Sequence, residues 1–126
     1  MCIMSKYFTF LELIKTDTGL NNIPVHMEHV ENLVCLCDLL DAIREDFGAP
    51  IVVNSAFRDN HVNIAVGGAA DSLHRVGRAA DIRPNYYPSK DYYWNFQNLI
   101  NVVKKYEDDL VEIIIDPKSR YIHIAI

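Results

Sequence analysis

The clearest pattern in the chain is a run of apolar residues at three- and four-residue steps between residues 26 and 47. Its members are Val30, Leu33, Val34, Cys37, Leu40, Ile43 and Phe47. This spacing places them on one face, so the segment is predicted to form a long amphipathic helix. Gly48 and Pro50 follow directly and are typical of a helix end.

Three other segments are expected to be helical. Residues 8–14 form a short apolar stretch before a break at residues 22–24. Ser89 can cap a helix that runs to about Tyr106, with apolar residues on its inner side. Residues 54–72 are rich in Asn, Asp, Ala and Gly, so we expect a loop there, with a short helix near residues 59–66.

Four short β-branched or apolar runs predict strands, at residues 51–53, 79–83, 111–115 and 121–125. Pro84 stops the second strand, and residues 86–88 read as a turn. A turn at residues 116–119 joins the last two strands into an antiparallel hairpin. The predicted class is therefore α+β, with a small, mainly antiparallel sheet packed against helices. We expect one domain spanning residues 1–126.

Composition narrows the function classes. Of the 126 residues, 50% are hydrophobic and 23% are charged, which is typical of a globular domain. The net charge of −5, with no basic run, argues against a nucleic-acid partner. No apolar stretch is long enough to span a membrane, and we find no signal peptide. We therefore expect a monomer made in the cytoplasm. The odd cysteine count, three, leaves at least one thiol free.

The candidate chemistry lies between Ser72 and Asp81. Gly77 allows the chain to turn tightly after His74, so that Asp81 returns to the same point. His123 on the last strand could supply a third ligand, because its neighbours Ile122 and Ile124 face the opposite side. Two imidazoles and one carboxylate are typical of an open catalytic zinc site. A hydrogen-bonded His–Asp pair with a separate core histidine would satisfy the same spacing.

Several motifs in the chain resemble those of one family. Ser72, His74, Gly77, Ala79 and Asp81 match the Ser-x-His-x-x-Gly-x-Ala-x-Asp motif of the zinc D-Ala-D-Ala carboxypeptidases and endopeptidases, relatives of the VanX dipeptidases. The segments at residues 54–58, 63–69 and 121–124 are similar to further motifs of the short, phage-associated branch. The resemblance implies a hedgehog/DD-peptidase-like fold and hydrolysis of an amide bond in peptidoglycan stem peptides or cross-links.

The resemblance also implies roles for individual residues. His74, Asp81 and His123 would bind zinc. Arg58 would bind the substrate or stabilise the negative charge of the tetrahedral intermediate. Ser72 would hydrogen-bond within the substrate site, although the residue could equally be a loop cap.

A hydrolase of this kind needs a general base. Some family members place a carboxylate three residues before the last histidine, where this chain has Arg120. The short branch has an acid at the end of the preceding strand instead, and Asp116 occupies that place. We expect Asp116 to be the base, with Glu112 as the second candidate. The residue that is commonly Gln between the family's Ser and His is Leu73 here.

Other interpretations remain open on the sequence alone. A chain that kept the metal but lost turnover would be a zinc-containing cell-wall-binding or structural domain. A chain whose three ligands are core residues would be an interaction domain without metal. His26 and His29 could share a metal, but no third ligand is apparent, so we expect them and His61 at the surface. The bond that is cut is not specified.

Overall fold

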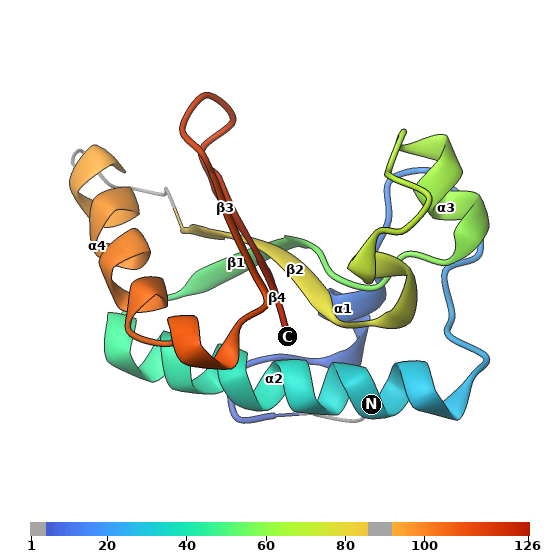
Figure 1. Ribbon diagram of the computed structural model, residues 1–126, viewed down its shortest axis with the longest axis horizontal. Helices are drawn as coiled ribbons and strands as arrows, with labels where there is room; N and C mark the ends of the chain where they lie inside the picture. The colour runs from blue at the N-terminus through green and yellow to red at the C-terminus, as the bar shows by residue number, and fades with distance from the viewer. Residues whose placement is uncertain (1–4, 86–91) are drawn as a thin grey trace.

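The computed structural model describes residues 5–85 and 92–126. The chain forms one four-stranded sheet, and Figure 1 shows a long helix beneath the sheet and a second helix at one end. The strands are β1 (Ile51–Ser55), β2 (Ala79–Pro84), β3 (Glu112–Asp116) and β4 (Tyr121–Ala125). Their order in the sheet is β1-β2-β4-β3, and every neighbouring pair is antiparallel. The predicted α+β class with an antiparallel sheet is confirmed.

The helices lie close to their predicted positions. They are α1 (Phe10–Ile14), α2 (Met27–Phe47), α3 (Asn60–Ala65) and α4 (Tyr92–Lys104), with 3-10 turns η1 (Leu73–Val76) and η2 (Glu107–Asp109). The first helix begins two residues later than predicted, because Thr9 caps it and forms a reciprocal capping box with Glu12. Gly48 ends α2 in the left-handed conformation, as its position indicated.

The remaining differences are small. The predicted turn at residues 86–88 and the cap at Ser89 lie outside the described residues. The strand at Ile51 continues to Ser55, two residues further than its β-branched run. A short 3-10 helix lies at Leu73–Val76, between the predicted loop at residues 54–72 and β2, where the sequence predicted no element.

One face of the sheet forms the core. Ile82, Ile122 and Ile124 point toward α2 and α4 and are fully buried. Asp81, directly before Ile82, and His123, between Ile122 and Ile124, point to the opposite face and are only partly buried. The period-two alternation of strands produces this division, as the pattern around His123 predicted.

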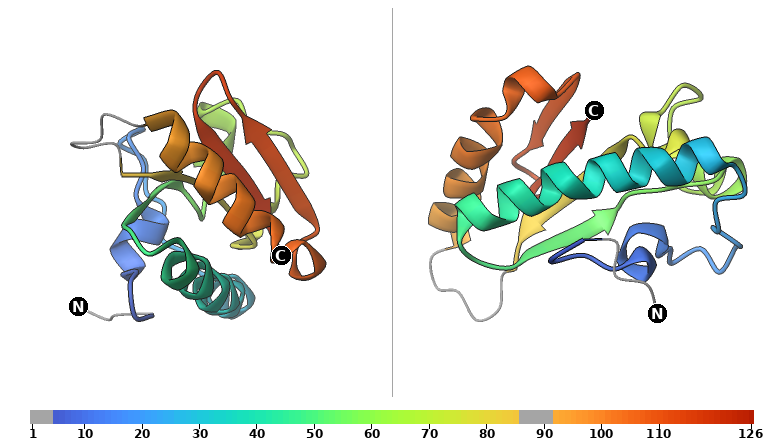
Figure 2. Two further views of the ribbon diagram at one scale, coloured as in Figure 1. Left: turned by 90° about the vertical axis from the view of Figure 1, so that its left-hand side faces the viewer. Right: turned by 90° about the horizontal axis from the view of Figure 1, so that it is seen from below.

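The open face of the sheet therefore carries the polar side chains. Figure 1 and the right-hand view of Figure 2 place α2 along the other face, with α3 at the end of the molecule where α2 starts. Asp81 on β2 and His123 on β4 are direct cross-strand partners. The register of this pair thus decides which side chains meet on the open face.

Candidate metal centre

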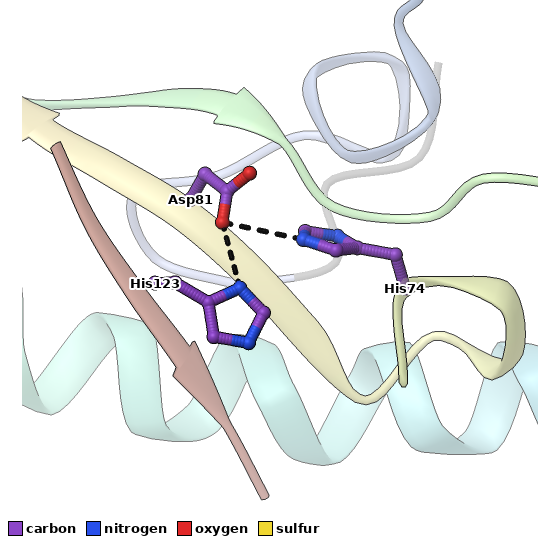
Figure 3. Close-up of side chains that lie close together, drawn as sticks. All are labelled: His74, Asp81 and His123. Carbon is purple, nitrogen blue, oxygen red and sulfur yellow. Dashed lines mark hydrogen bonds and ion pairs between the residues drawn. The ribbon is translucent and has the colours of Figure 1, made fainter. Parts of the chain in front are cut away.

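Three ligand-type side chains meet on the open face of the sheet. His74 comes from η1, Asp81 from β2 and His123 from β4, and Figure 3 shows both imidazoles turned toward one carboxylate oxygen. The Asp81 Oδ1 atom lies 3.2 Å from His74 Nε2 and 2.8 Å from His123 Nδ1. One ligand atom from each residue lies within 4.8 Å of the other two. This group could hold a metal ion.

The geometry fits a small tetrahedral metal. Ligand atoms around zinc, with bonds of about 2.0–2.1 Å, lie about 3.3 Å from one another. The separation of 3.2 Å between His74 Nε2 and Asp81 Oδ1 is close to that value, and the 2.8 Å between His123 Nδ1 and Asp81 Oδ1 is shorter. Three protein ligands leave a fourth position for a water or a substrate, which is typical of catalytic rather than structural zinc.

The outer nitrogen of each imidazole is already held. His74 Nδ1 donates to the backbone oxygen of Ala56 at 2.6 Å, and His123 Nε2 lies 2.8 Å from Glu112 Oε1. A carbonyl can only accept, so Nε2 of His74 carries no proton when this ring is neutral. Both ring nitrogens of His123 face carboxylate oxygens, Asp81 Oδ1 at Nδ1 and Glu112 Oε1 at Nε2, so either nitrogen of this imidazole can donate. Such outer partners orient metal-binding imidazoles and set their tautomers.

The second oxygen of Asp81 faces Arg58. Arg58 Nη2 lies 3.5 Å from Asp81 Oδ2, and both side chains are about 85% buried, with exposures of 15% and 14%. The guanidinium also donates to Ser55 Oγ at 3.1 Å and to Asn63 Oδ1 at 3.2 Å. Gly68 leaves room for this group, because a Cβ atom there would overlap Asn63 Oδ1 and lie 2.8 Å from Arg58 Nη1, so one of these side chains would have to shift. Arg58 is thus a fixed cation next to the candidate ligands.

The hydrogen bonds between Asp81 and the two imidazoles determine how these side chains are protonated. Burial raises the pKa of Asp81, but the hydrogen bonds to His123 and His74 outweigh burial and bring the pKa to about 2. The hydrogen bond to Asp81 is the largest influence on His123 and, despite burial, raises the pKa of this imidazole. Asp81 is therefore ionised at neutral pH, in the form that binds metal.

A cleft of about 310 Å³ opens over the three ligand-type residues. Arg58, Ser72, Leu73, Glu112 and Tyr121 also line it. Ser72 caps η1, because its hydroxyl accepts from the backbone N–H of His74 at 3.2 Å. The cap and the cleft-lining position are compatible, so the predicted substrate-binding role of Ser72 stays a prediction.

The two candidate bases occupy different surroundings. Both point to the open face of β3, on either side of Ile114, which is the cross-strand partner of His123. Glu112 lines the cleft and contacts His123. Asp116 does not line the cleft, and its Oδ1 accepts from the backbone N–H groups of Lys118 and Ser119 in the hairpin turn. The structure brings Glu112 and not Asp116 into the group.

Sequence reasoning missed two contributors. Tyr121 lines the cleft two residues before His123 on the same strand face. Burial and then the Asp81 carboxylate raise its pKa, so the phenol keeps its proton at neutral pH. Asn63 is almost fully buried and accepts from Arg58, with its amide donating to Ala69. The period-two pattern around His123 could have located Tyr121, whereas the Asn63 contacts depend on how the loop folds.

A small α+β domain with an open His–Asp–His group on a sheet face is the arrangement of a hydrolytic metalloenzyme. Comparison with known families defines the class further. The Peptidase M15 family matches residues 6–125, and the chain belongs to this family. The match confirms the predicted membership among the zinc D-Ala-D-Ala carboxypeptidase relatives. The protein is therefore a metallopeptidase of a zinc-dependent family, whose substrates are peptides.

A search of curated proteins finds no match to this chain. None of the helices in residues 5–85 and 92–126 combines the length and apolar character that crossing a membrane requires.

Proposed function

We propose that this chain is a zinc peptidase domain that hydrolyses an amide bond in peptidoglycan stem peptides or cross-links. The observation that supports the proposal most is the convergence of His74, Asp81 and His123 under a cleft of about 310 Å³. These three side chains would hold a zinc ion, and the chemistry it would supply is that of a Lewis acid, which polarises a carbonyl and lowers the pKa of bound water.

Arg58 is proposed to stabilise the negative charge that develops on the scissile carbonyl oxygen. Its guanidinium is held by Ser55 and Asn63 and lies against Asp81, so the positive charge needs no rearrangement during the reaction. The contact with Asp81 Oδ2 gives Arg58 a second role, which is to leave Oδ1 of that carboxylate facing the imidazoles.

The proton is proposed to move through Glu112. One of its oxygens accepts from His123, the side chain is 41% exposed, and the carboxylate lines the cleft. Its other oxygen can take a proton from the attacking water and return it to the departing amine. Asp116 remains the second candidate, because it lies on the same strand face, although the turn N–H groups already engage one of its oxygens.

The test is release of soluble peptides or amines from purified peptidoglycan by the zinc-loaded chain, followed by mass spectrometry of the products. The product masses identify the bond, and so distinguish a carboxypeptidase, an L-Ala-D-Glu endopeptidase and a cross-link endopeptidase. Glu112→Gln is expected to reduce the rate by about 10²–10⁴-fold with zinc still bound. Asp116→Asn, the matched control on the same strand, is expected to keep most activity.

Three outcomes would change the proposal. Loss of activity in Asp116→Asn alone would return the base to Asp116. A wild-type chain that binds one zinc but cleaves no amide would favour a non-catalytic wall-binding or structural zinc domain. A chain that binds no zinc would contradict the metal centre itself.

A further inference from the structure

The five histidines of the chain fall into two groups. His74 and His123 belong to the candidate metal centre. The other three, His26, His29 and His61, all line one separate cavity of about 230 Å³. The sequence showed only the pair at the start of α2, because His61 is 32 residues further along the chain than His29. The fold supplies the third imidazole.

Residues from the segment before α2, the start of α2 and the start of α3 line the cavity. Figures 1 and 2 place these elements at one end of the molecule. The cavity is distinct from the cleft. Phe57, Asp59 and Arg75 line the cavity, whereas their chain neighbours Arg58 and His74 line the cleft. The two hollows therefore share a wall, made of residues 57–59 and η1, which the hydrogen bond from Arg58 N to His74 O ties together.

The imidazoles of this cavity are available to a ligand. His26 and His61 are exposed, and His29 is half-buried. Within the described part of the chain, none of the three rings forms a hydrogen bond. The His26 and His29 rings meet edge to face with centroids 5.0 Å apart, and His29 also packs on Phe57. Burial, and then the nearby His26, lower the pKa of His29, so its ring is neutral at pH 7.

We propose that His26, His29 and His61 form a second binding site for a divalent transition metal such as zinc. Imidazole is a preferred ligand of zinc, copper and nickel, and neutral imidazole is the form that binds. Asp59 also lines the cavity, and its carboxylate already caps α3 by accepting from the backbone N–H of Val62. The site does not depend on the proposed peptidase activity.

This second site is weaker than the first. Among the described residues, only the His74 group has its ligand atoms within 4.8 Å of one another. Binding in the cavity therefore requires the exposed side chains of His26 and His61 to rotate toward His29. Such rotations are fast for exposed residues, but fixing the rotamers reduces the affinity.

The experiment is zinc titration of the purified full chain, with any affinity tag removed, by calorimetry and elemental analysis. Wild type is expected to bind two equivalents in a tight and a weaker class. The double variant His26→Ala/His61→Ala is expected to lose the weaker class and keep the tight one. Glu28→Ala, an exposed acid in the same helical turn but outside the cavity lining, is the matched control and is expected to keep both.

Ring-nitrogen NMR gives a direct readout. The second equivalent of zinc should shift the imidazole nitrogens of His26, His29 and His61 after those of the first site have already shifted. Saturation of wild type at one equivalent, or a weaker class that survives in the double variant, would overturn the inference. A chain that retains the weaker class but lacks the tight class and amide cleavage would contradict the proposed function and leave this site standing.

Discussion

Adding one methyl group at Gly77 should destabilise the fold, because both the backbone conformation and the surroundings oppose a side chain there. The residue ends η1, directly after the turn that carries His74, with φ 78° and ψ 20°. A Cβ atom there would lie 2.6 Å from the backbone oxygen of His29 and 3.1 Å from Leu33 Cγ, both on α2. The backbone oxygen cannot rotate away, so η1 or α2 has to move.

The expected destabilisation of Gly77→Ala is the sum of three effects. An alanine in the left-handed region costs about 1–2 kcal/mol. The reduced freedom of the unfolded chain returns about 0.4–1 kcal/mol. The steric overlap adds about 1–3 kcal/mol, as for overpacked cores. Together these give a loss of about 1–5 kcal/mol in the free energy of unfolding, centred near about 3 kcal/mol.

The matched control is Gly67→Ala. Gly67 has nearly the same conformation, with φ 74°, but a Cβ atom there would have no neighbour within 4 Å. Urea unfolding of the two zinc-free variants, followed by circular dichroism, therefore isolates the steric part. Gly67→Ala is expected to lose about 1 kcal/mol or less. Equal losses in the two variants would show that the close approach of η1 to α2 is not needed, and would refute the reasoning.

Three further predictions concern the buried Asn22 amide, the position of the Arg58 guanidinium and the protonation of His123. Asn22→Ala should lower the free energy of unfolding by about 2–4 kcal/mol in the urea assay. The buried Asn22 amide joins α1 to residues 57–59 through three hydrogen bonds of 2.8 Å, and the variant loses all three. A loss under about 0.5 kcal/mol would contradict this role. Gly68→Ala should slow amide hydrolysis and leave the zinc affinity nearly unchanged. The added Cβ atom would lie 2.0 Å from Asn63 Oδ1 and displace Arg58. An unchanged rate of hydrolysis would argue against a fixed Arg58 guanidinium. Finally, His123 has a raised pKa in the metal-free protein, so zinc must displace its proton. The apparent zinc affinity should fall about tenfold per pH unit below that pKa. The same imidazole stabilises the metal-free fold fully below its unfolded pKa of 6.5, and this contribution should disappear as the pH rises through the raised value. Zinc affinity that is flat between pH 6 and 8, or metal-free stability that rises over this range, would contradict the assignment.

Much of the fold follows from local patterns. The three- and four-residue steps that predicted α2 match its observed start within one residue and its end at Phe47. The alternation around His123 placed that side chain correctly opposite the core, because a strand allows only two faces. The bounds of α2 and the orientation of His123 depend on residues close together in the chain, so they can be predicted from the sequence alone.

Which candidate base lies beside the ligand-type residues, and which histidines share a cavity, depend on how distant segments align. Glu112 reaches His123 only because β3 pairs with β4 in the observed alignment, and the resemblance to known peptidases favoured Asp116 at the end of the strand. The joining of His61 to the His26 pair depends on where α3 packs. Neither is encoded within one element, so hydrophobic periodicity could not have shown them.

The pairing of Asp81 with His123 across β2 and β4 has a consequence for how the chain can change in length. The distance between these two side chains is set by strand alignment rather than by the loops that connect the strands. An insertion between Pro117 and Ser119, in the exposed hairpin turn, can lengthen the loop without altering that alignment. A single deletion within β4 before His123 would turn the imidazole toward the core. The hairpin tip is thus the natural place to graft a peptide or a label, and β4 is the least tolerant segment of the sheet.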